Sequence, residues 1–165
     1  MKYDRAHYIE KLIKHEGIVL NVYKDSLGID TIGIGRNLED RGITKEELDY
    51  LDIPSINHVY EFGITEEDAV YLATNDIEIV EEELCRAHSC VEDLDAVRQL
   101  VVMDMAFNMG AAGGGGLAAF KNMKRAVLAK QYEKAADEMT SSRWCGQVGR
   151  RCRNLVGRMR ALGNC

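Results

Sequence analysis

The stretch from Glu16 to Gly35, EGIVLNVYKDSLGIDTIGIG, decides how this chain is interpreted. It places a glutamate at the expected end of a helix and, nine residues later, an aspartate in a Tyr-Lys-Asp turn. Six residues further on, Thr31 opens a Thr-Ile-Gly-Ile-Gly strand, whose glycines would let a bulky polymer lie close to the backbone. Two such carboxylates suit the cleavage of a sugar chain, because one can donate a proton while the other manages the attacking water.

Local patterns predict firm supports for both carboxylates. Apolar residues at helical spacing and a possible N-cap at Asp4 predict a helix over residues 4–15, which Gly17 ends. Glu16 would then lie at the negative end of the helix dipole, which favours the protonated acid needed for proton donation. Asp25 falls in a polar turn between two strand-like runs, where we expect it to stay ionised.

The second strand-like run covers residues 29–38. Alternation along a strand places Thr31, Gly33 and Gly35 on one face and directs the isoleucines between them to the core. Asp30 points with the isoleucines and is the weaker catalytic candidate.

The spacing of these carboxylates and glycines, taken alone, has simpler explanations. In a chain with 29% charged residues, carboxylates fall nine positions apart by chance. Gly33 and Gly35 could mark a bulge or a packing contact. The segment also lacks the third glycine and the following helix of a dinucleotide-binding fingerprint.

The complete pattern is more specific than its parts. Glu-Gly, five residues, Tyr-Lys-Asp, two residues, Gly, two residues and Thr-Ile-Gly-Ile-Gly together resemble the phage-type lysozymes, the endolysin muramidases of glycoside hydrolase family 24. The resemblance continues in AFNMG (106–110), SRW (142–144), Gln147 and the arginine-rich segment after it. It spans nearly the whole chain and is strongest in the first 38 residues.

The resemblance implies an α+β, lysozyme-like fold in one domain with two lobes around a cleft. We expect a small antiparallel-sheet lobe over about 17–64 and a linking helix over about 65–87. A larger helical lobe would cover about 88–165 and include the N-terminal helix, 4–15.

The resemblance also implies an activity, the hydrolysis of the β-1,4 bond between N-acetylmuramic acid and N-acetylglucosamine in peptidoglycan, without metal or organic cofactor. By motif, Glu16 matches the general acid, Asp25 the carboxylate that supports the attacking water, and Thr31 the hydroxyl that helps to hold this water. Phe107 and Asn108 match positions that line the cleft.

Gly35 and Asn37 are further candidates for substrate contact. The family resemblance favours direct displacement by water with inversion. Two other readings stay open, a non-catalytic peptidoglycan-binding module on the same fold and a helical scaffold protein. Arg36 departs from the histidine that the family commonly has there, so we expect an ion pair of the small lobe to be rearranged.

Composition agrees with a small soluble enzyme, and we expect a monomer. A length of 165 residues predicts one domain, and no run of 18 apolar residues predicts a membrane span. The first sixteen residues are charged throughout and lack the apolar core of a signal peptide. The family then implies accumulation in the host cytoplasm before release to the cell wall. A net charge of −6 without aromatic-basic interleaving makes nucleic acid a poor partner.

Charge is distributed unevenly. Residues 61–95 hold twelve acidic residues and one basic residue, whereas residues 141–165 hold six arginines and no acid. We expect the arginine segment to meet carboxylates of the polymer, with ordinary solvated helix faces as the equal alternative.

The remainder predicts mostly helices. Thr44 and Glu47 form a capping box before a short helix, residues 51–63 around Pro54 look like a connecting loop, and Thr65 caps the long helix. Further helices are expected over 96–109, 118–129, 132–141 and 147–161, with a flexible loop at the four glycines 113–116.

The five cysteines meet no zinc spacing, so no metal site is expected. Cys145 and Cys152 would lie about 10 Å apart on a continuous helix, too far for a disulfide unless the chain bends near Gly146 or Gly149. The odd count and the missing signal peptide favour reduced thiols.

Overall fold

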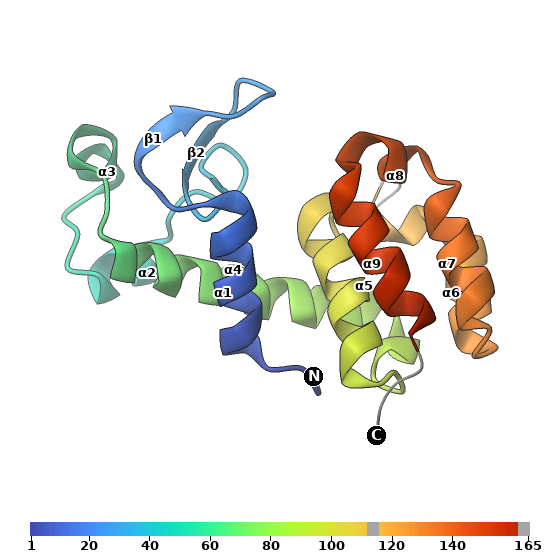
Figure 1. Ribbon diagram of the computed structural model, residues 1–165. Coiled ribbons are helices and arrows are strands. Elements are labelled where there is room, and N and C mark those ends of the chain that lie inside the picture. The colour runs from blue at the N-terminus through green and yellow to red at the C-terminus, as the bar shows by residue number, and fades with distance from the viewer. Residues whose placement is uncertain (112–115, 162–165) are drawn as a thin grey trace. The chain divides into compact units, whose positions relative to one another are not determined.

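The computed structural model describes residues 1–111 and 116–161. The chain forms two compact units, which we call the sheet unit (Asp4–Glu78) and the helical unit (Met1–Tyr3 with the chain from Ile79 onward). Helices predominate, and one three-stranded antiparallel sheet lies in the sheet unit (Figure 1). The expected α+β class is confirmed.

The sheet unit begins with the expected helix. Helix α1 (Arg5–Glu16) starts where the Asp4 carboxylate accepts hydrogen bonds from two backbone amides of the first turn. It ends at Gly17, whose positive φ of 77° favours glycine and whose amide donates to the Ile13 carbonyl at 2.8 Å. Tyr8 and Leu12 form the buried face of the helix.

The sheet is shorter than expected. Strands β1 (Val19–Lys24), β2 (Asp30–Gly33) and β3 (Arg36–Asn37) pair in the order β1-β2-β3. The predicted run over 29–38 is therefore two strands joined by a tight turn. Gly33 has a φ of 66°, and a Cβ there would lie 3.4 Å from the Ala69 Cβ, so this glycine serves chain reversal and packing rather than a bare polymer-binding face.

Two helices follow the sheet. Helix α2 (Lys45–Tyr50) carries the predicted Thr44–Glu47 capping box. The prediction of a loop over 51–63 is wrong in its second half, because Ser55 caps helix α3 (Ile56–Phe62) through the His58 amide. Val59 of α3 is fully buried in a core cluster of the sheet unit, whose buried members are Ile32, Leu38, Val59, Ile64, Ala69 and Leu72.

The long helix α4 (Glu66–Ala87) begins at the predicted cap, where Thr65 and Asp68 exchange side-chain to backbone hydrogen bonds. The boundary between the two units falls inside this helix. Helix α1 lies in the sheet unit by its contacts, whereas the resemblance to the family implies a place in the helical lobe.

The helical unit contains short 3-10 helices η1 (Ser89–Val91) and η2 (Leu117–Ala119) and helices α5 to α9 (Figure 1). Helix α5 (Ala96–Met109) matches its prediction and is buried along most of its length. The other helices of the unit are α6 (Lys121–Leu128), α7 (Tyr132–Thr140), α8 (Arg143–Val148) and α9 (Arg150–Arg160), of which α9 packs against α5. The expected helix over 147–161 is thus two helices, because Gly149 with a φ of 51° separates α8 from α9.

Buried Arg98 connects three helices of this unit. Its guanidinium lies 3.7 Å from the centre of the Tyr132 ring and donates to the Met159 carbonyl at 3.0 Å. It also pairs with Asp95, the N-cap of α5, at 2.6 Å. Burial opposes ionisation of Asp95, but hydrogen bonds from Arg98 hold the pKa of this carboxyl below its ordinary value.

No helix in the described parts of the chain is both long enough and apolar enough to cross a membrane. The expected glycine loop lies outside the described residues except for Gly116.

A buried ion-pair network, the Arg36 network, joins β3 to α2 and α4. Arg36 pairs with Glu47 at 2.7 Å and with Asp76 at 2.8 Å, and all three side chains are buried. Arg41 also reaches Asp76 at 2.8 Å, and the Asn75 amide donates to Glu47 at 3.0 Å. The predicted rearrangement at Arg36 thus gives a network that spans three elements.

The two carboxyls of the network respond differently to burial. Burial opposes ionisation of Glu47, but hydrogen bonds from Asn75 and the Thr44 amide and the charge of Arg36 hold the pKa of Glu47 below its ordinary value. Burial raises the pKa of Asp76, against the opposing charges of Arg36 and Arg41.

We predict that Arg36→Met lowers the free energy of unfolding by about 3–5 kcal/mol, because Glu47 and Asp76 lose their main counter-charge while still buried. Urea unfolding of the variant measures this loss. The matched control is Lys45→Met, whose exposed pair with Asp49 should contribute little. Similar losses in both variants would contradict a special role for Arg36.

We predict that Glu47→Gln weakens the acid sensitivity of folding. The folded-state pKa of Glu47 lies below its ordinary value of 4.5, so its ionisation stabilises the fold above that pH, and the contribution is lost as pH falls through the folded pKa. The variant should therefore lose less unfolding free energy between about pH 6 and about pH 3 than the parent chain does. Exposed Glu46→Gln is the control, and an unchanged pH profile in Glu47→Gln would refute the prediction.

Candidate functional site

Glu16 is the last residue of α1 and is exposed. Its position follows from the two ends of the helix, since Asp4 fixes the start and Gly17 fixes the stop. A glutamate at a helix terminus that is held in this way can present its carboxyl to a ligand without reorganising the backbone.

Asp25 begins the turn between β1 and β2. Its Oδ1 accepts hydrogen bonds from the Leu27 amide at 2.8 Å and the Ile29 amide at 2.9 Å, and its backbone carbonyl accepts from Gly28 at 3.0 Å. Oδ2 accepts no hydrogen bond from the described part of the chain. One oxygen thus fixes the turn, and the other is available to a water or a substrate.

Thr31 lies in β2 and is 4% exposed. Its hydroxyl donates to the Ile29 carbonyl at 3.1 Å, so the oxygen can still accept a hydrogen bond from a water. Thr31 is the cross-strand partner of Tyr23, two residues before Asp25.

The phenol of Tyr23 links the two carboxylates. Burial raises the pKa of Tyr23 above its ordinary value, and the negative charges of Glu16 and Asp25 raise it further. Both carboxylates therefore act on one side chain. All three predicted catalytic residues belong to the sheet unit, and Tyr23, which has no role in the sequence prediction, pairs with one of them and is influenced by the charges of the other two.

Asp30 serves the other face of the sheet, as its alternation predicted. It pairs with Lys24 at 2.8 Å and accepts a hydrogen bond from the Tyr60 hydroxyl at 3.1 Å. The hydrogen bond from Lys24 is the main cause that lowers the pKa of Asp30, so this acid stays ionised and paired.

The two other residues of the sheet unit that we predict to contact substrate, Gly35 and Asn37, differ in their surroundings. Gly35 is exposed, with open space where a side chain would be. Asn37 uses its side-chain oxygen to accept from the backbone amides of Glu39 and Asp40 at 2.9 and 2.8 Å. Their contact with substrate stays a prediction.

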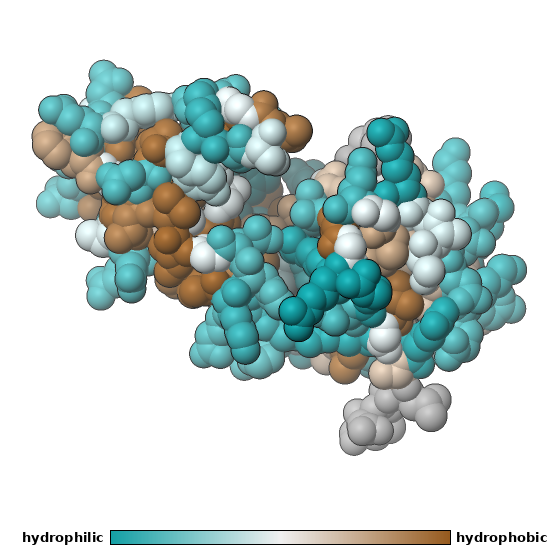
Figure 2. Space-filling model, turned by 45° about the horizontal axis from the view of Figure 1, so that its top comes forward, coloured by the Kyte–Doolittle hydropathy of each residue, from teal (hydrophilic) through white to brown (hydrophobic). Residues whose placement is uncertain are grey.

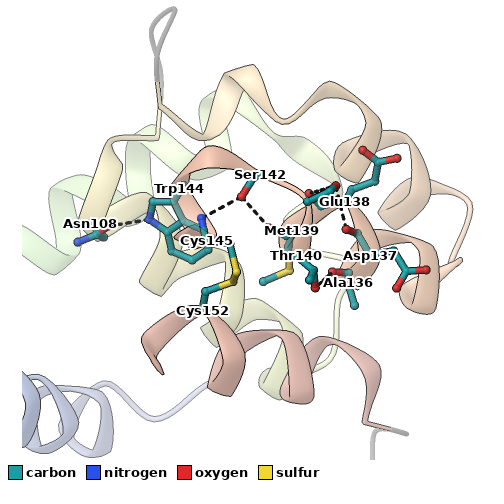
Figure 3. The surroundings of a disulfide bond; sticks show 11 residues. Asn108, Ala136, Asp137, Glu138, Met139, Thr140, Ser142, Trp144, Cys145 and Cys152 are labelled. Atoms are coloured by element: carbon teal, nitrogen blue, oxygen red, sulfur yellow. Dashed lines mark hydrogen bonds between the residues drawn. A yellow bond between two sulfur atoms is a disulfide. The ribbon is translucent and has the colours of Figure 1, made fainter. Parts of the chain in front are cut away.

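Phe107 and Asn108 lie in the last turn of α5, in the helical unit. The Asn108 Oδ1 accepts a hydrogen bond from the Trp144 indole at 2.8 Å, and Figure 3 shows this bond next to a disulfide. Trp144 is buried, as expected, and meets the Phe120 ring edge-on at 6.3 Å. The polar side chain of Asn108 thus orients an aromatic residue from α8.

The helical unit also contains a pocket that the sequence reasoning missed. It has a volume of about 840 Å³, and residues from the ends of α5, α7 and α8 and the start of α6 line it. Apolar Phe120 and Trp144 meet polar Glu138, Arg143 and Gln147 there. The SRW and Gln147 matches were its only sequence signal.

Cys145 and Cys152 form a disulfide with Cα atoms 5.1 Å apart, shown in Figure 3. The expectation of reduced thiols is wrong for this pair, because it assumed a helix that continues through Gly149. The turn at Gly149 folds α9 back toward α8, and the disulfide joins the two helices beside Trp144.

Some arginines of the segment 141–165 form ion pairs within the protein, and others are exposed. Arg151 donates to Asp104 at 3.1 Å, and Arg160 pairs with Glu133 at 3.2 Å and with Asp137. Arg150 and Arg153 are exposed and make no ion pair within the described residues. These two remain candidates for contact with an anionic polymer.

A helix-borne glutamate, an aspartate in a hairpin turn and a strand threonine on a small sheet define a lysozyme-like arrangement. The sequence model of the family "Phage lysozyme" matches residues 13–161, and the chain belongs to this family.

Curated relatives agree with the family. Two proteins of Dictyostelium discoideum, probable T4-type lysozymes 1 and 2, are 27% and 24% identical, each over 90% of this chain and 91% of their own length. The pre-baseplate central spike protein Gp5 of Enterobacteria phage T4 is 32% identical over 84% of this chain. The chain spans about a quarter of the length of that spike protein, 25%.

We predict that loss of the disulfide destabilises the helical unit. Closure of so short a loop contributes about 2–3 kcal/mol in the chain-entropy account, so Cys145→Ser/Cys152→Ser should unfold at lower urea concentration by that amount. Reductant should shift the parent chain similarly and leave the double variant unchanged. Cys85→Ser, at a cysteine outside the disulfide, is the control. A parent chain that does not respond to reductant would contradict the prediction.

Proposed function

We propose that the chain hydrolyses the β-1,4 bond between N-acetylmuramic acid and N-acetylglucosamine in bacterial peptidoglycan. One observation carries the proposal: in the sheet unit Glu16 ends a helix that is capped at both ends, and Asp25 is fixed by the hairpin turn that its own carboxylate closes. Membership of the phage lysozyme family and the names of the two Dictyostelium relatives support it.

In the proposed reaction Glu16 donates a proton to the leaving glycosidic oxygen. Asp25 uses its open Oδ2 to accept a proton from the attacking water, which the Thr31 oxygen helps to orient. Water attacks the anomeric carbon directly, so the product has inverted configuration. This acid–base chemistry needs no cofactor. The side chains of a single chain supply all of its groups.

The alternative from another class is a peptidoglycan-binding module without turnover. The Gp5 match shows that a related segment also exists inside a longer protein. If this chain is such a segment, hydrolysis is the proposed role of the segment alone.

We predict that Glu16→Gln slows clearing of a peptidoglycan suspension by about 10²- to 10⁴-fold, because it removes the proton donor and keeps the shape. Asp25→Asn should lose a comparable factor. Glu10→Gln, an exposed glutamate on the same helix, is the matched control and should clear at the parent rate. New reducing ends, labelled with borohydride, identify the sugar on which cleavage occurs.

The outcomes separate the two functions. Equal clearing by the parent and Glu16→Gln would remove Glu16 from its role. Polymer binding without clearing by either chain would favour the binding module. NMR of the first-formed anomer tests inversion separately.

A further inference from the structure

Tyr23 is a neighbour of two of the proposed catalytic residues, Thr31 across the sheet and Asp25 along the chain. It is directly opposite Thr31 in the antiparallel ladder, and residues paired in this way project from the same face with Cβ atoms about 5 Å apart. Asp25 follows two residues later, at the start of the turn that leaves β1. An irregularity in β1 between Val19 and Tyr23 adjusts the direction of this part of the strand.

The next residue pair of the ladder indicates on which face of the sheet Tyr23 lies. Lys24 and Asp30 are the next cross-strand partners, and their ion pair, together with Tyr60, occupies the opposite face. The Tyr23 ring therefore shares its face with Thr31 and not with this polar cluster. The effect of both Glu16 and Asp25 on the Tyr23 phenol agrees with this placement.

The Tyr23 side chain has exposed surface and a hydroxyl group that can both contact a ligand. It is 36% exposed, and its hydroxyl makes no hydrogen bond to the described residues. Other exposed tyrosines of the sheet unit are engaged: Tyr50 stacks on Tyr71 with ring centres 4.3 Å apart, and Tyr60 donates to Asp30. Figure 2 shows brown hydrophobic patches among teal hydrophilic surface over this unit.

We propose that Tyr23 is a substrate-contacting residue that binds the pyranose ring next to the bond that is cleaved. Its ring supplies an apolar face for the C–H side of the sugar, and its hydroxyl donates a hydrogen bond to a sugar oxygen. This proposal rests on the proposed function and assigns part of the substrate site to a residue that the sequence motif left without a role.

The chemistry of the surroundings favours this assignment. A sugar whose glycosidic bond is attacked by a water that Thr31 and Asp25 hold lies at the face of the sheet that Tyr23 shares with Thr31. A phenol among carboxylates keeps its proton at neutral pH and so remains a donor, and hydroxyl and acetamido oxygens of the substrate accept. Tyrosine presents one apolar face and one polar tip with few rotatable bonds, which suits a ligand with the same two characters.

The first experiment measures binding without turnover. In the Glu16→Gln background, sedimentation with purified peptidoglycan and titration with a hexamer of β-1,4-linked N-acetylglucosamine give the affinity. Tyr23→Ala should weaken binding at least about tenfold, since the ring contact and the hydrogen bond are both lost. Tyr23→Phe keeps the ring and should lose only about two- to tenfold.

The matched controls are Tyr60→Ala and Tyr60→Phe, at an exposed tyrosine of the same unit whose partner lies on the other face. With Glu16 intact and soluble peptidoglycan fragments as substrate, Tyr23→Ala should raise KM more than it lowers kcat. Circular dichroism and thermal unfolding verify that each variant is folded, and Tyr23→Phe keeps the test decisive if Tyr23→Ala unfolds.

Weaker binding in the graded order Ala below Phe, with unchanged Tyr60 controls, supports the proposal. Equal binding by Tyr23→Ala and the background chain overturns it, as do equal losses at Tyr23 and Tyr60. Failure of the proposed function appears elsewhere, as a parent chain that neither binds nor clears peptidoglycan, and it would overturn the assignment of Tyr23 as well.

Discussion

The sheet unit depends on one buried guanidinium. Strand β3 has two residues, too few for its ladder hydrogen bonds alone to fix it, and Arg36 attaches this strand to α2 and α4 through Glu47 and Asp76. Arg36 is the cross-strand partner of Ile32, and the next ladder pair includes Thr31. The network therefore holds the strand that carries a proposed catalytic hydroxyl. A buried guanidinium with several carboxylate and carbonyl partners gives this fixed geometry, because any other arrangement leaves a charge unpaired away from water.

The proposed acid and base need less of the fold. Glu16 is placed by a helix with a cap at each end, and Asp25 by a turn that its own carboxylate closes. Each support lies within a few residues of the group that it holds. Thr31 and Tyr23 are different, because their relation exists only when β1 and β2 pair. The site thus combines two local devices with one strand pairing that the Arg36 network stabilises.

This difference explains what could be predicted from the sequence. Helix α1, the Thr44 and Thr65 caps and the roles by motif of Glu16 and Asp25 rest on patterns of a few residues, and the three structural predictions were confirmed. The end of β2 at Gly33 and helix α3 were missed, because a positive φ or a lone serine cap is not distinguished by composition. The break at Gly149 was only the alternative to a continuous helix, for the same reason. The partners of Arg36, at positions 47 and 76, and the Tyr23–Thr31 pair depend on tertiary contact and have no local signature.

In the helical unit, a short helix is stabilised by contacts with its surroundings. Helix α8 has six residues, too few to be stable by itself, yet it supplies Trp144 and Gln147 to the pocket of this unit. Three contacts stabilise α8: the Ser142 N-cap, the hydrogen bond from the Trp144 indole to Asn108 and the disulfide from Cys145 to α9. The first two are hydrogen bonds, whereas the disulfide is covalent. The disulfide thus cross-links this wall of the pocket to α9, whereas the supports of the proposed chemistry in the sheet unit are caps, a turn and buried ion pairs.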